Sequence, residues 1–439
     1  MAWPRRSYPW RWMILLARFA GLLVCVGTFL SLGIFIPHLV ESFSTTTAAA
    51  GLICSGSWAF GMIIGGPFVG ALLNSCDPRK VTMIGGMLSA ITNTAAAASS
   101  SITQLAVWFA VSSGGLLFVQ IATVKAVAEY FPDNFAVANG VSLAGGMVGM
   151  MVFPPVMEFL ISLYGWRGAL AIMGAVTFHY VVCGALLRPL HHKRAEKYSL
   201  VPSRGDSEDV NSKSGQQADG KSRSCQVPTA SQNLTESVTE YLDTQLLTEP
   251  LFIVYQVVVV LCGIVYTMWH LFLVQRGIEL GIMEFQAAFL ATFGGLGSLA
   301  GRLGHGPLVD SGLVKASTLF AIASLVFAVS CLINILVASW YSALAVNYFV
   351  SGMASGVTYS LAYVMVREVT GDHHMSAFGW LFTSLGTGEI LGGFIAGWIH
   401  DTTGDYGIVV LAIGGLAFIM GVTVTLTRCL ISWSGGSDE

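Results

Sequence analysis

The sequence predicts an all-α polytopic membrane protein, with twelve transmembrane helices arranged in two six-helix halves. Three observations predict this fold class: the composition, the recurrence of long apolar runs, and a weak internal repeat. Of the 439 residues, 54% are hydrophobic and 10% are charged, whereas about a quarter of a soluble globular chain is charged. The mean hydropathy is +0.70. This composition favours a membrane over water as the surroundings of the protein.

Apolar runs of roughly 20 residues recur along the chain, and a helix of that length crosses a hydrocarbon core of about 30 Å. The first run is too long for a signal-peptide core and shows no small-residue cleavage pattern, so we expect it to be retained. Twelve spans are predicted, and they begin near Met13, Thr47, Val81, Thr103, Phe135 and Arg167, and again near Pro250, Glu284, Leu313, Trp340, Met375 and Tyr406.

The spans divide the chain into five parts. We expect a cytoplasmic N-terminus (1–12), a first six-helix half (13–188), a linker (189–249), a second six-helix half (250–430) and a cytoplasmic tail (431–439). The linker is rich in Ser, Gln, Asp and Lys. Such a segment cannot bury a core, so it is predicted to be disordered.

A weak repeat relates the two halves. GGPFVG at 65–70 resembles HGPLVD at 305–310, an offset of 240 residues. Ala-Asn-Gly at 138–140 corresponds to Ala-Phe-Gly at 377–379, and Glu129 to Glu368, both at an offset of 239. Matches at one nearly constant offset are what two parallel six-helix repeats leave behind.

The distribution of cations predicts the orientation, because loops on the cytoplasmic side carry more Lys and Arg. With a cytoplasmic N-terminus, the outer loops hold little beyond Arg167 and Arg276. Arg167, beside Trp166, then lies at the outer end of the sixth helix, where an interfacial anchor or a partner for a carboxylate such as Glu158 is favoured over a substrate contact. The inner segments hold the cations of the linker together with Arg5, Arg6, Arg11, Arg79, Lys80, Lys193, Arg194, Lys197 and Lys315. We therefore expect both termini and the linker in the cytoplasm and the protein in the plasma membrane.

Several function classes find no support in the sequence. The eight cysteines are scattered, without a metal-ligand or disulfide pattern. There is no phosphate-binding loop and no nucleophile with a neighbouring base, so no enzyme, no cofactor and no metal is predicted, and no nucleic-acid partner. Any transport must then be driven by a gradient.

Three stretches of the first half and three of the second resemble the monocarboxylate transporters, a family of the major facilitator superfamily. The first-half stretches are EYFPDNFAVANGVSLAGGMVG (129–149) with YGWRGALAIMG (164–174), and GTFLSLGIFI (27–36). The second-half stretches are SGVTYSLAYVMVREVTG (355–371), SAFGWLF (376–382) and GGFIAGWIHDTTGDY (392–406). The resemblance implies the major facilitator fold and carriage of a small organic anion, in some members with a proton or a single-span accessory protein.

The sequence also departs from that family. SYPWRW (7–12) lacks the acid and glycines that usually open the first helix, and Asp133-Asn134-Phe135 replaces a basic cluster. Proton-linked lactate carriers of the family have an Asp four residues before the Arg of helix 8, where this chain has Ser298, and a Lys in helix 1, where it has none. These departures leave substrate and proton coupling open.

Arg302 is the leading candidate for substrate binding. It lies well inside the eighth predicted helix, and an arginine at that depth needs a cavity or a partner. Its planar fork suits a carboxylate. An ion pair between helices or a gate contact is the alternative.

Glu389, in the glycine-rich SLGTGEILGG (384–393), is the candidate for proton coupling. Burial favours the protonated form of a carboxyl group. Pairing with Arg302 or Arg18 is the alternative, and is slightly favoured. For Arg18 itself, an extension towards the cytoplasmic interface is favoured over the cavity.

The tenth predicted span, which begins near Trp340, offers three further candidate cavity residues: Asn347, Tyr359 and Tyr363. The two tyrosines share a face by their spacing of four. The loop after helix 2 occupies the place of the gating loop of the superfamily, with Asp77, Arg79 and Lys80, and Asp310 occupies the equivalent place in the second half.

Paired glycines spaced by four residues occur on helices 2, 5, 8 and 11, where they allow close contact between helices. In carriers of this build, those helices are where the two halves touch and rock. The pairs are Gly61/Gly65, Gly145/Gly149, Gly297/Gly301 and Gly388/Gly392.

Together these features predict a secondary transporter that moves a small monocarboxylate or related metabolite by alternating access. Two alternatives stay open. One is a carrier of the same fold for an amino acid, a zwitterion or another solute by facilitated diffusion. The other is a receptor or scaffold that has lost transport.

Overall fold

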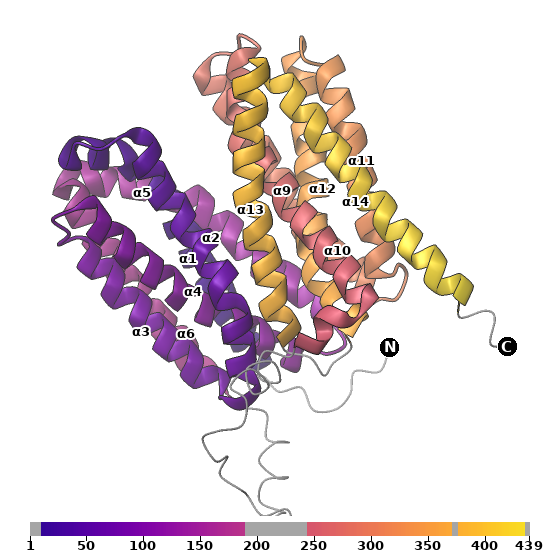
Figure 1. Cartoon of the computed structure of the whole chain (residues 1–439), viewed down its shortest axis with the longest axis horizontal. Helices are drawn as coiled ribbons and strands as arrows, with labels where there is room; N and C mark the ends of the chain where they lie inside the picture. Colours follow the sequence, from indigo (N-terminus) through magenta and orange to yellow (C-terminus); the bar gives the residue numbers. More distant parts are fainter. Residues whose placement is uncertain (1–9, 189–243, 371–375, 435–439) are drawn as a thin grey trace, which may run out of the picture.

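The structure is a computed structural model, and it describes residues 10–188, 244–370 and 376–434. Within these ranges all regular secondary structure is helical (Figure 1). The predicted cytoplasmic N-terminus before residue 10, linker residues 189–243 and tail residues 435–439 lie outside the described ranges.

Apart from α6, the helices begin within about three residues of the predicted positions; the sixth predicted span, from near Arg167, begins inside α5. The N-terminal half contains α1 (Arg11–Phe43), α2 (Thr47–Ser75), α3 (Pro78–Ala96), α4 (Ile102–Tyr130), α5 (Phe135–Thr177) and α6 (His179–Leu186). The C-terminal half contains α9 (Pro250–Glu279), α10 (Glu284–Asp310), α11 (Ala316–Leu336), α12 (Tyr341–Thr370), α13 (Ser376–Thr403) and α14 (Tyr406–Ser434), preceded by a single 3-10 turn (Thr244–Thr248).

Local sequence explains where several helices begin and end. The side chain of Ser101 accepts the backbone N–H of Gln104 at the start of α4, and Pro250 opens α9; both are preferred at helix starts. Gly281 and Gly404 follow α9 and α13 with φ values of 78° and 69°. Glycine adopts that left-handed conformation without steric cost, so it ends a helix readily.

The chain reverses direction inside α5, at Gly165, where φ is 67° and ψ is 171°. Before this point, successive glycines of α5 pack against successive turns of α1 in the same direction. After it, the indole N–H of Trp166 donates to Ser42 near the end of α1, and that of Trp10, at the start of α1, donates to the carbonyl of Leu186. The chain on either side of Gly165 therefore forms two antiparallel spans.

Eight stretches of the described chain are long and apolar enough to cross a membrane, and one of them contains both arms of the α5–α6 segment. The helices α3, α10 and α13 are less apolar because they carry many glycine and hydroxyl residues. With these three and the two arms counted separately, the described residues form twelve spans, in agreement with the prediction.

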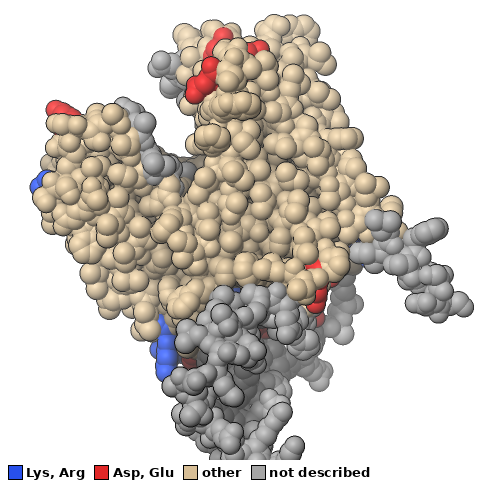
Figure 2. All heavy atoms as spheres, viewed as in Figure 1, with Lys and Arg blue, Asp and Glu red and all other residues tan. Residues whose placement is uncertain are grey.

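The two halves form separate bundles that converge at one end and splay apart at the other (Figure 1). We call the convergent end, where residues 187–188 and 244–250 lie, the linker end, and the other the splayed end. In the space-filling view a notch separates the halves at the splayed end, and the charged side chains visible there gather at the two ends (Figure 2). The uncharged flanks expose large apolar residues such as Ile84, Leu336 and Phe394, as expected for a surface that faces lipid.

The halves touch mainly through α2 with α13 and through α5 with α10. The side chain of Asn139 on α5 donates to the carbonyl of Ser360 on α12 at 3.2 Å. The hydroxyl of Thr383 on α13 donates to the carbonyl of Ile63 on α2 at 3.3 Å. The helices predicted to form the interface between the halves are therefore the ones that do so.

The paired glycines, however, pack inside each half. A Cβ atom on any of the four pairs would collide with a helix of the same half: α4 for the pair on α2, α1 for α5, α12 for α10, and α9 for α13. Other glycines bring the halves together. A Cβ atom on Gly140 would collide with the carbonyl of Arg302, and Gly66 and Gly379 approach each other's backbone. The motif identified close packing correctly, but it carries no information about which neighbour is close.

Candidate functional site

Arg302 occupies the middle of a polar cluster in the C-terminal half. Only 1% of the residue is exposed, because the glycine-rich face of α10 packs closely against α12. Its Nε lies 3.4 Å from the hydroxyl of Ser298, and its Nη2 lies 3.4 Å from that of Tyr266 on α9. Both are long hydrogen bonds. The guanidinium carbon lies 4.9 Å from the ring centre of Tyr359 on α12, within the range of a cation–π contact.

No carboxylate pairs with Arg302 among the described residues. The ion pairs in that part of the chain join Arg276 to Glu279, Arg276 to Asp405, and His400 to Asp401. A buried guanidinium without a counter-charge is destabilising by several kcal/mol. Aromatic faces and two weak hydroxyl contacts offset only part of this cost. The site is therefore suited to an anion, and above all to a carboxylate that matches the guanidinium fork.

Three tyrosines surround the cluster. The rings of Tyr266 and Tyr359 are 4.4 Å apart, and those of Tyr359 and Tyr363 are 5.9 Å apart. Tyr363 packs edge-on against Phe382 of α13. The predicted substrate residues Tyr359 and Tyr363 thus lie together beside Arg302. Tyrosine supplies an apolar face and a hydroxyl, which suits a small organic molecule with a polar end.

Glu389 lies on α13, half-buried, within electrostatic range of Tyr266, Tyr359 and Tyr363. Its carboxyl group faces the indole of Trp58 on α2, in the other half. The alternative that Glu389 pairs with Arg302 or Arg18 does not agree with the structure, because neither guanidinium lies within 4.0 Å of its carboxyl oxygens. An acid and a base therefore face the same cluster without neutralising each other directly.

Arg18 does not extend towards the interface, as the sequence suggested. It is 1% exposed, and its Nη1 donates to the carbonyl of Gln120 and the hydroxyl of Thr123 on α4, both at 3.1 Å. Close packing of α1 on α4 and α5 surrounds the side chain. The residue faces the interior of the molecule.

Asn347 does not belong to the cluster. Its side-chain amide donates to the carbonyl of Ser330 at 2.9 Å and its carbonyl accepts from Asn334, both on α11. At about 100° per residue, Asn347 lies about a third of a turn around α12 from Tyr359. Its side chain joins two helices inside the C-terminal half, so the interpretation of Asn347 as a cavity residue is wrong.

The four predicted gating residues divide into two groups. Asp77 caps α3 by accepting the backbone N–H of Arg79 at 3.1 Å, and both Arg79 and Lys80 are exposed at the linker end. Asp310 instead reaches across to the other half, where its carboxylate accepts the first free N–H groups of α5. Of the four, Asp310 is therefore the residue that lies at the contact between the halves.

Sequence reasoning missed Tyr266 and Trp58. Tyr266 lies under both Arg302 and Tyr359, and His270 stacks on it at 4.0 Å. The spacing of four between Tyr266 and His270 on an apolar helix is the one sign in the sequence that this face of α9 is polar. Trp58 left no such sign, because an indole on an apolar helix is common in lipid-facing and buried positions alike.

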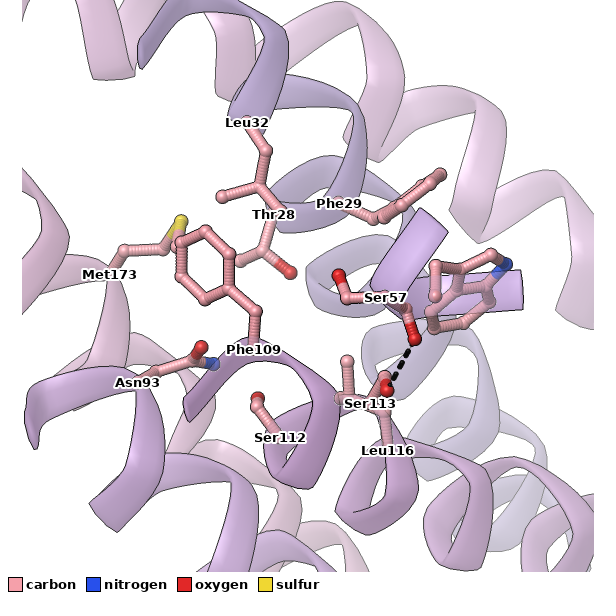
Figure 3. Close-up of a pocket in the computed structure, with 11 residues that line it drawn as sticks. Thr28, Phe29, Leu32, Ser57, Asn93, Phe109, Ser112, Ser113, Leu116 and Met173 are labelled. Atoms are coloured by element: carbon pink, nitrogen blue, oxygen red, sulfur yellow. Dashed lines mark hydrogen bonds between the residues drawn. The ribbon is translucent and has the colours of Figure 1, made fainter. Parts of the chain in front are cut away.

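A separate small pocket lies inside the N-terminal half, between α1, α2, α3 and α4 (Figure 3). Its volume of about 30 Å³ is room for a water molecule or two. Asn93 faces it without a hydrogen-bond partner among the described residues, and Ser113 donates to the carbonyl of Ser57 at 2.7 Å. The pocket is too small for an organic substrate, which directs attention back to Arg302.

Comparison with known proteins identifies the family. The model of the Major Facilitator Superfamily matches residues 17–311 and 257–431. The chain belongs to the major facilitator superfamily. Monocarboxylate transporter 13 of Rattus norvegicus is 28% identical over 95% of this chain and 89% of that protein. Monocarboxylate transporter 2 of Mus musculus is 26% identical over 96% and 84%, and monocarboxylate transporter 14 of Mus musculus is 25% identical over 95% and 90%.

Solved structures agree on the fold. The crystal structure of an E. coli fucose:proton symporter variant superposes with a TM-score of 0.65, at 15% identity, over 96% of this chain and 99% of that one. A second structure of this symporter, described as outward, gives a TM-score of 0.59 at 14% identity over 94% and 99%. This major facilitator protein is thus related to monocarboxylate transporters, as its motifs predicted, and its relatives are named as carriers rather than enzymes.

Proposed function

We propose that this major facilitator protein moves a small monocarboxylate, or a related organic metabolite, across the plasma membrane by alternating access. The observation that carries the proposal is Arg302, a fully buried guanidinium beside two tyrosine rings with no carboxylate partner among the described residues. A substrate carboxylate completes this environment, since it supplies both the missing charge and two acceptor oxygens. The names of the relatives support the same class of cargo.

The orientation follows from the placement of the cations. Arg79, Lys80 and Arg367 lie at the linker end, whereas Arg167 and Arg276 lie at the splayed end. By the rule that cytoplasmic loops are richer in cations, the linker end faces the cytoplasm, with both termini. The halves converge at that end and splay apart at the other (Figure 1), which in this proposed orientation corresponds to an outward-facing state.

Glu389 is the proton-coupling residue of the proposal. It is the acidic side chain nearest the cluster among the described residues, and it has no cationic partner within 4.0 Å. Protonation when the site faces outwards and release when it faces inwards would couple uptake to an inward proton gradient.

The first experiment measures uptake of labelled L-lactate into cells that express the protein, at external pH 6 and about 7.4, with surface expression confirmed by biotinylation. The variants are Arg302→Gln and Arg302→Lys, and the matched control is Arg167→Gln at the splayed end. A charge-assisted hydrogen bond is worth about 1.5–3 kcal/mol, so Arg302→Gln is expected to reduce uptake at least about tenfold. Arg302→Lys keeps the charge but not the guanidinium fork, so its uptake should lie between that of the wild type and that of Arg302→Gln.

Three outcomes separate the readings. Uptake that rises at acidic pH and falls in Arg302→Gln supports a proton-coupled carboxylate carrier. Uptake independent of pH supports facilitated diffusion of the same cargo. Absence of lactate uptake by surface-expressed wild type contradicts the lactate version and directs the search to other solutes.

A second candidate cargo is an amino acid or another zwitterion. The specific observation is that Arg302 and Glu389 face one cluster with opposite charges and do not pair. A zwitterion places a carboxylate on Arg302 and an ammonium on Glu389. A labelled panel of neutral amino acids, assayed in the same cells, distinguishes it: Glu389→Gln would then abolish uptake rather than only its pH dependence.

A further inference from the structure

A second buried arginine lies near the cluster, in the N-terminal half. Arg18 uses one nitrogen, Nη1, to bind α4, whereas its Nε and Nη2 are buried and have no hydrogen-bond partner in the described part of the chain. No carboxylate lies within 4.0 Å of it among the described residues. Half of a guanidinium fork is therefore held rigidly in place, and the other half is left without an acceptor.

The C-terminal half approaches the same guanidinium through Tyr363, which lies within electrostatic range of both Arg18 and Arg302. Tyr363 in turn contacts Tyr359, whose ring lies under Arg302. Two arginines, one from each half, are thus linked through two tyrosines of α12. Glu389 is within range of both tyrosines, but among the described residues it is the one carboxyl group near the two guanidinium groups.

The positions of these groups along their helices give an order of depth. Arg18 follows the first residue of α1, at the linker end, by seven residues, and Tyr363 precedes the last residue of α12 by the same number. Both therefore lie about 10 Å from the linker end, at 1.5 Å per residue. Glu389, 13 residues into α13, lies nearer the middle of the membrane. By the same count Arg302, eight residues before the last residue of α10, lies about 12 Å from the linker end. A path from the splayed end therefore meets Glu389 first and then the two arginines at nearly the same depth, with Arg18 slightly nearer the linker end.

In the described state the linker end is closed, because Asp310 accepts the N–H groups of Ala136 and Val137 there and Asn139 joins Ser360 deeper in the interface. When the halves rock to open that end, α5 and α12, which touch in this state, separate, and we expect the side chain of Arg18 to line the opening. Its free Nε and Nη2 then become accessible. A guanidinium edge of this geometry binds a carboxylate through two parallel hydrogen bonds.

We propose that Arg18 is a second carboxylate-binding residue, which holds the substrate in the inward-facing state on its way to or from Arg302. This inference rests on the proposed carriage of a carboxylate. It adds a binding residue from the N-terminal half, so that each half presents one arginine to the same anion. It also assigns an asymmetry: Arg302 acts at both faces of the membrane, whereas Arg18 acts at the cytoplasmic face.

The test compares affinities from the two sides. The purified protein is reconstituted in liposomes, and a protease added outside reports which molecules have their linker on the outer face. L-lactate influx and efflux are then measured for the wild type, Arg18→Gln, Arg18→Lys and the control Arg167→Gln. Arg18→Gln is expected to raise the KM from the linker side by about tenfold, the loss of one charged hydrogen-bonded contact, and to leave the KM from the splayed side within about twofold. Arg18→Lys should recover part of the loss.

An equal rise in KM on both sides, or no change on either, overturns the assignment of Arg18 while wild-type transport leaves the proposed function intact. Absence of transport in the wild type counts against the proposed function instead.

A substrate-free measurement then decides on Arg18 alone. Ser360, 0% exposed where α12 meets α5 above the closed linker end, is replaced by Cys in a background where Cys76, Cys225 and Cys429 are Ser. If the free edge of Arg18 is satisfied only when the linker end opens, Arg18→Met should slow alkylation of Ser360→Cys at least about fivefold. Unchanged or faster alkylation, with Arg167→Met as the matched control, overturns the proposal.

Discussion

The carboxylate of Asp310, the last residue of α10, accepts the backbone N–H of Val137 in the first turn of α5 at 2.7 Å. Its other oxygen accepts the N–H of Ala136 at 3.0 Å. An acid of the C-terminal half therefore caps a helix of the N-terminal half, where free N–H groups and the positive end of the helix dipole attract a negative charge. Nearby, Arg367 donates to the carbonyl of Pro132. The contact closes the linker end, and it exists only while the halves meet there.

Replacement of Asp310 by Asn should open the linker end more often. The amide keeps one acceptor but loses the charge, and a charge-assisted hydrogen bond is worth about 1.5–3 kcal/mol. We expect alkylation of Ser360→Cys to accelerate about tenfold. Asp77→Asn is the control, since Asp77 caps a helix of its own half. Equal acceleration in both variants would mean that the effect is general loosening rather than loss of the contact between the halves.

Tyr359 should contribute to anion binding through its ring rather than its hydroxyl. Its ring centre lies 4.9 Å from the guanidinium carbon of Arg302, and a cation–π contact contributes about 0.5–2 kcal/mol. We expect Tyr359→Phe to keep the KM for the carried carboxylate within about twofold, and Tyr359→Leu to raise it severalfold. Tyr341→Leu, at the other end of α12, is the control. If Phe and Leu are equally harmful, the hydroxyl is the group that matters.

Glu389→Gln should uncouple uptake from pH. Glutamine has nearly the shape of glutamic acid and retains a carbonyl that faces Trp58, but it cannot exchange a proton. The ratio of uptake at external pH 6 to that at pH 7.4 is expected to fall to about one, with uptake retained at both values. Glu389→Asp keeps a titratable group and should keep part of the ratio. If Glu389→Gln retained the full pH dependence, another residue would be the one that carries the proton.

The elements of the fold could be predicted from sequence because the membrane imposes a length on every span. Helix starts such as Phe135 and Pro250 agree for the same local reason, since each follows a break that the chain needs at the membrane surface. Arg302 could be predicted because a charge in a membrane helix demands a partner. In these cases the prediction needs only the local sequence or the length of an apolar run.

The facing of side chains could not be predicted in the same way. On a helix that is apolar all round, periodicity does not show which side meets which neighbour. Asn347 was therefore assigned to the cluster although it faces α11, and Arg18 was assigned to the interface although α4 holds it inside. Tyr266 was missed because its role depends on the packing of α9 against α10 and α12, helices distant in sequence.

Two glycines of α5 should respond differently to the same small substitution. A Cβ atom on Gly149 would collide with the carbonyl of Leu23 inside the N-terminal half, and one on Gly140 with the carbonyl of Arg302 across the interface. Overpacking costs about 1–3 kcal/mol, and the cost falls on whichever state contains the contact. Gly149→Ala should lower the melting temperature in detergent. Gly140→Ala should leave it nearer that of the control Gly21→Ala, whose Cβ would meet nothing within 4 Å, and should accelerate alkylation of Ser360→Cys. Because α1 and α5 stay packed throughout the cycle whereas α5 and α10 must part, a fall in melting temperature of the same size for both variants would argue against rocking of the halves as rigid bodies.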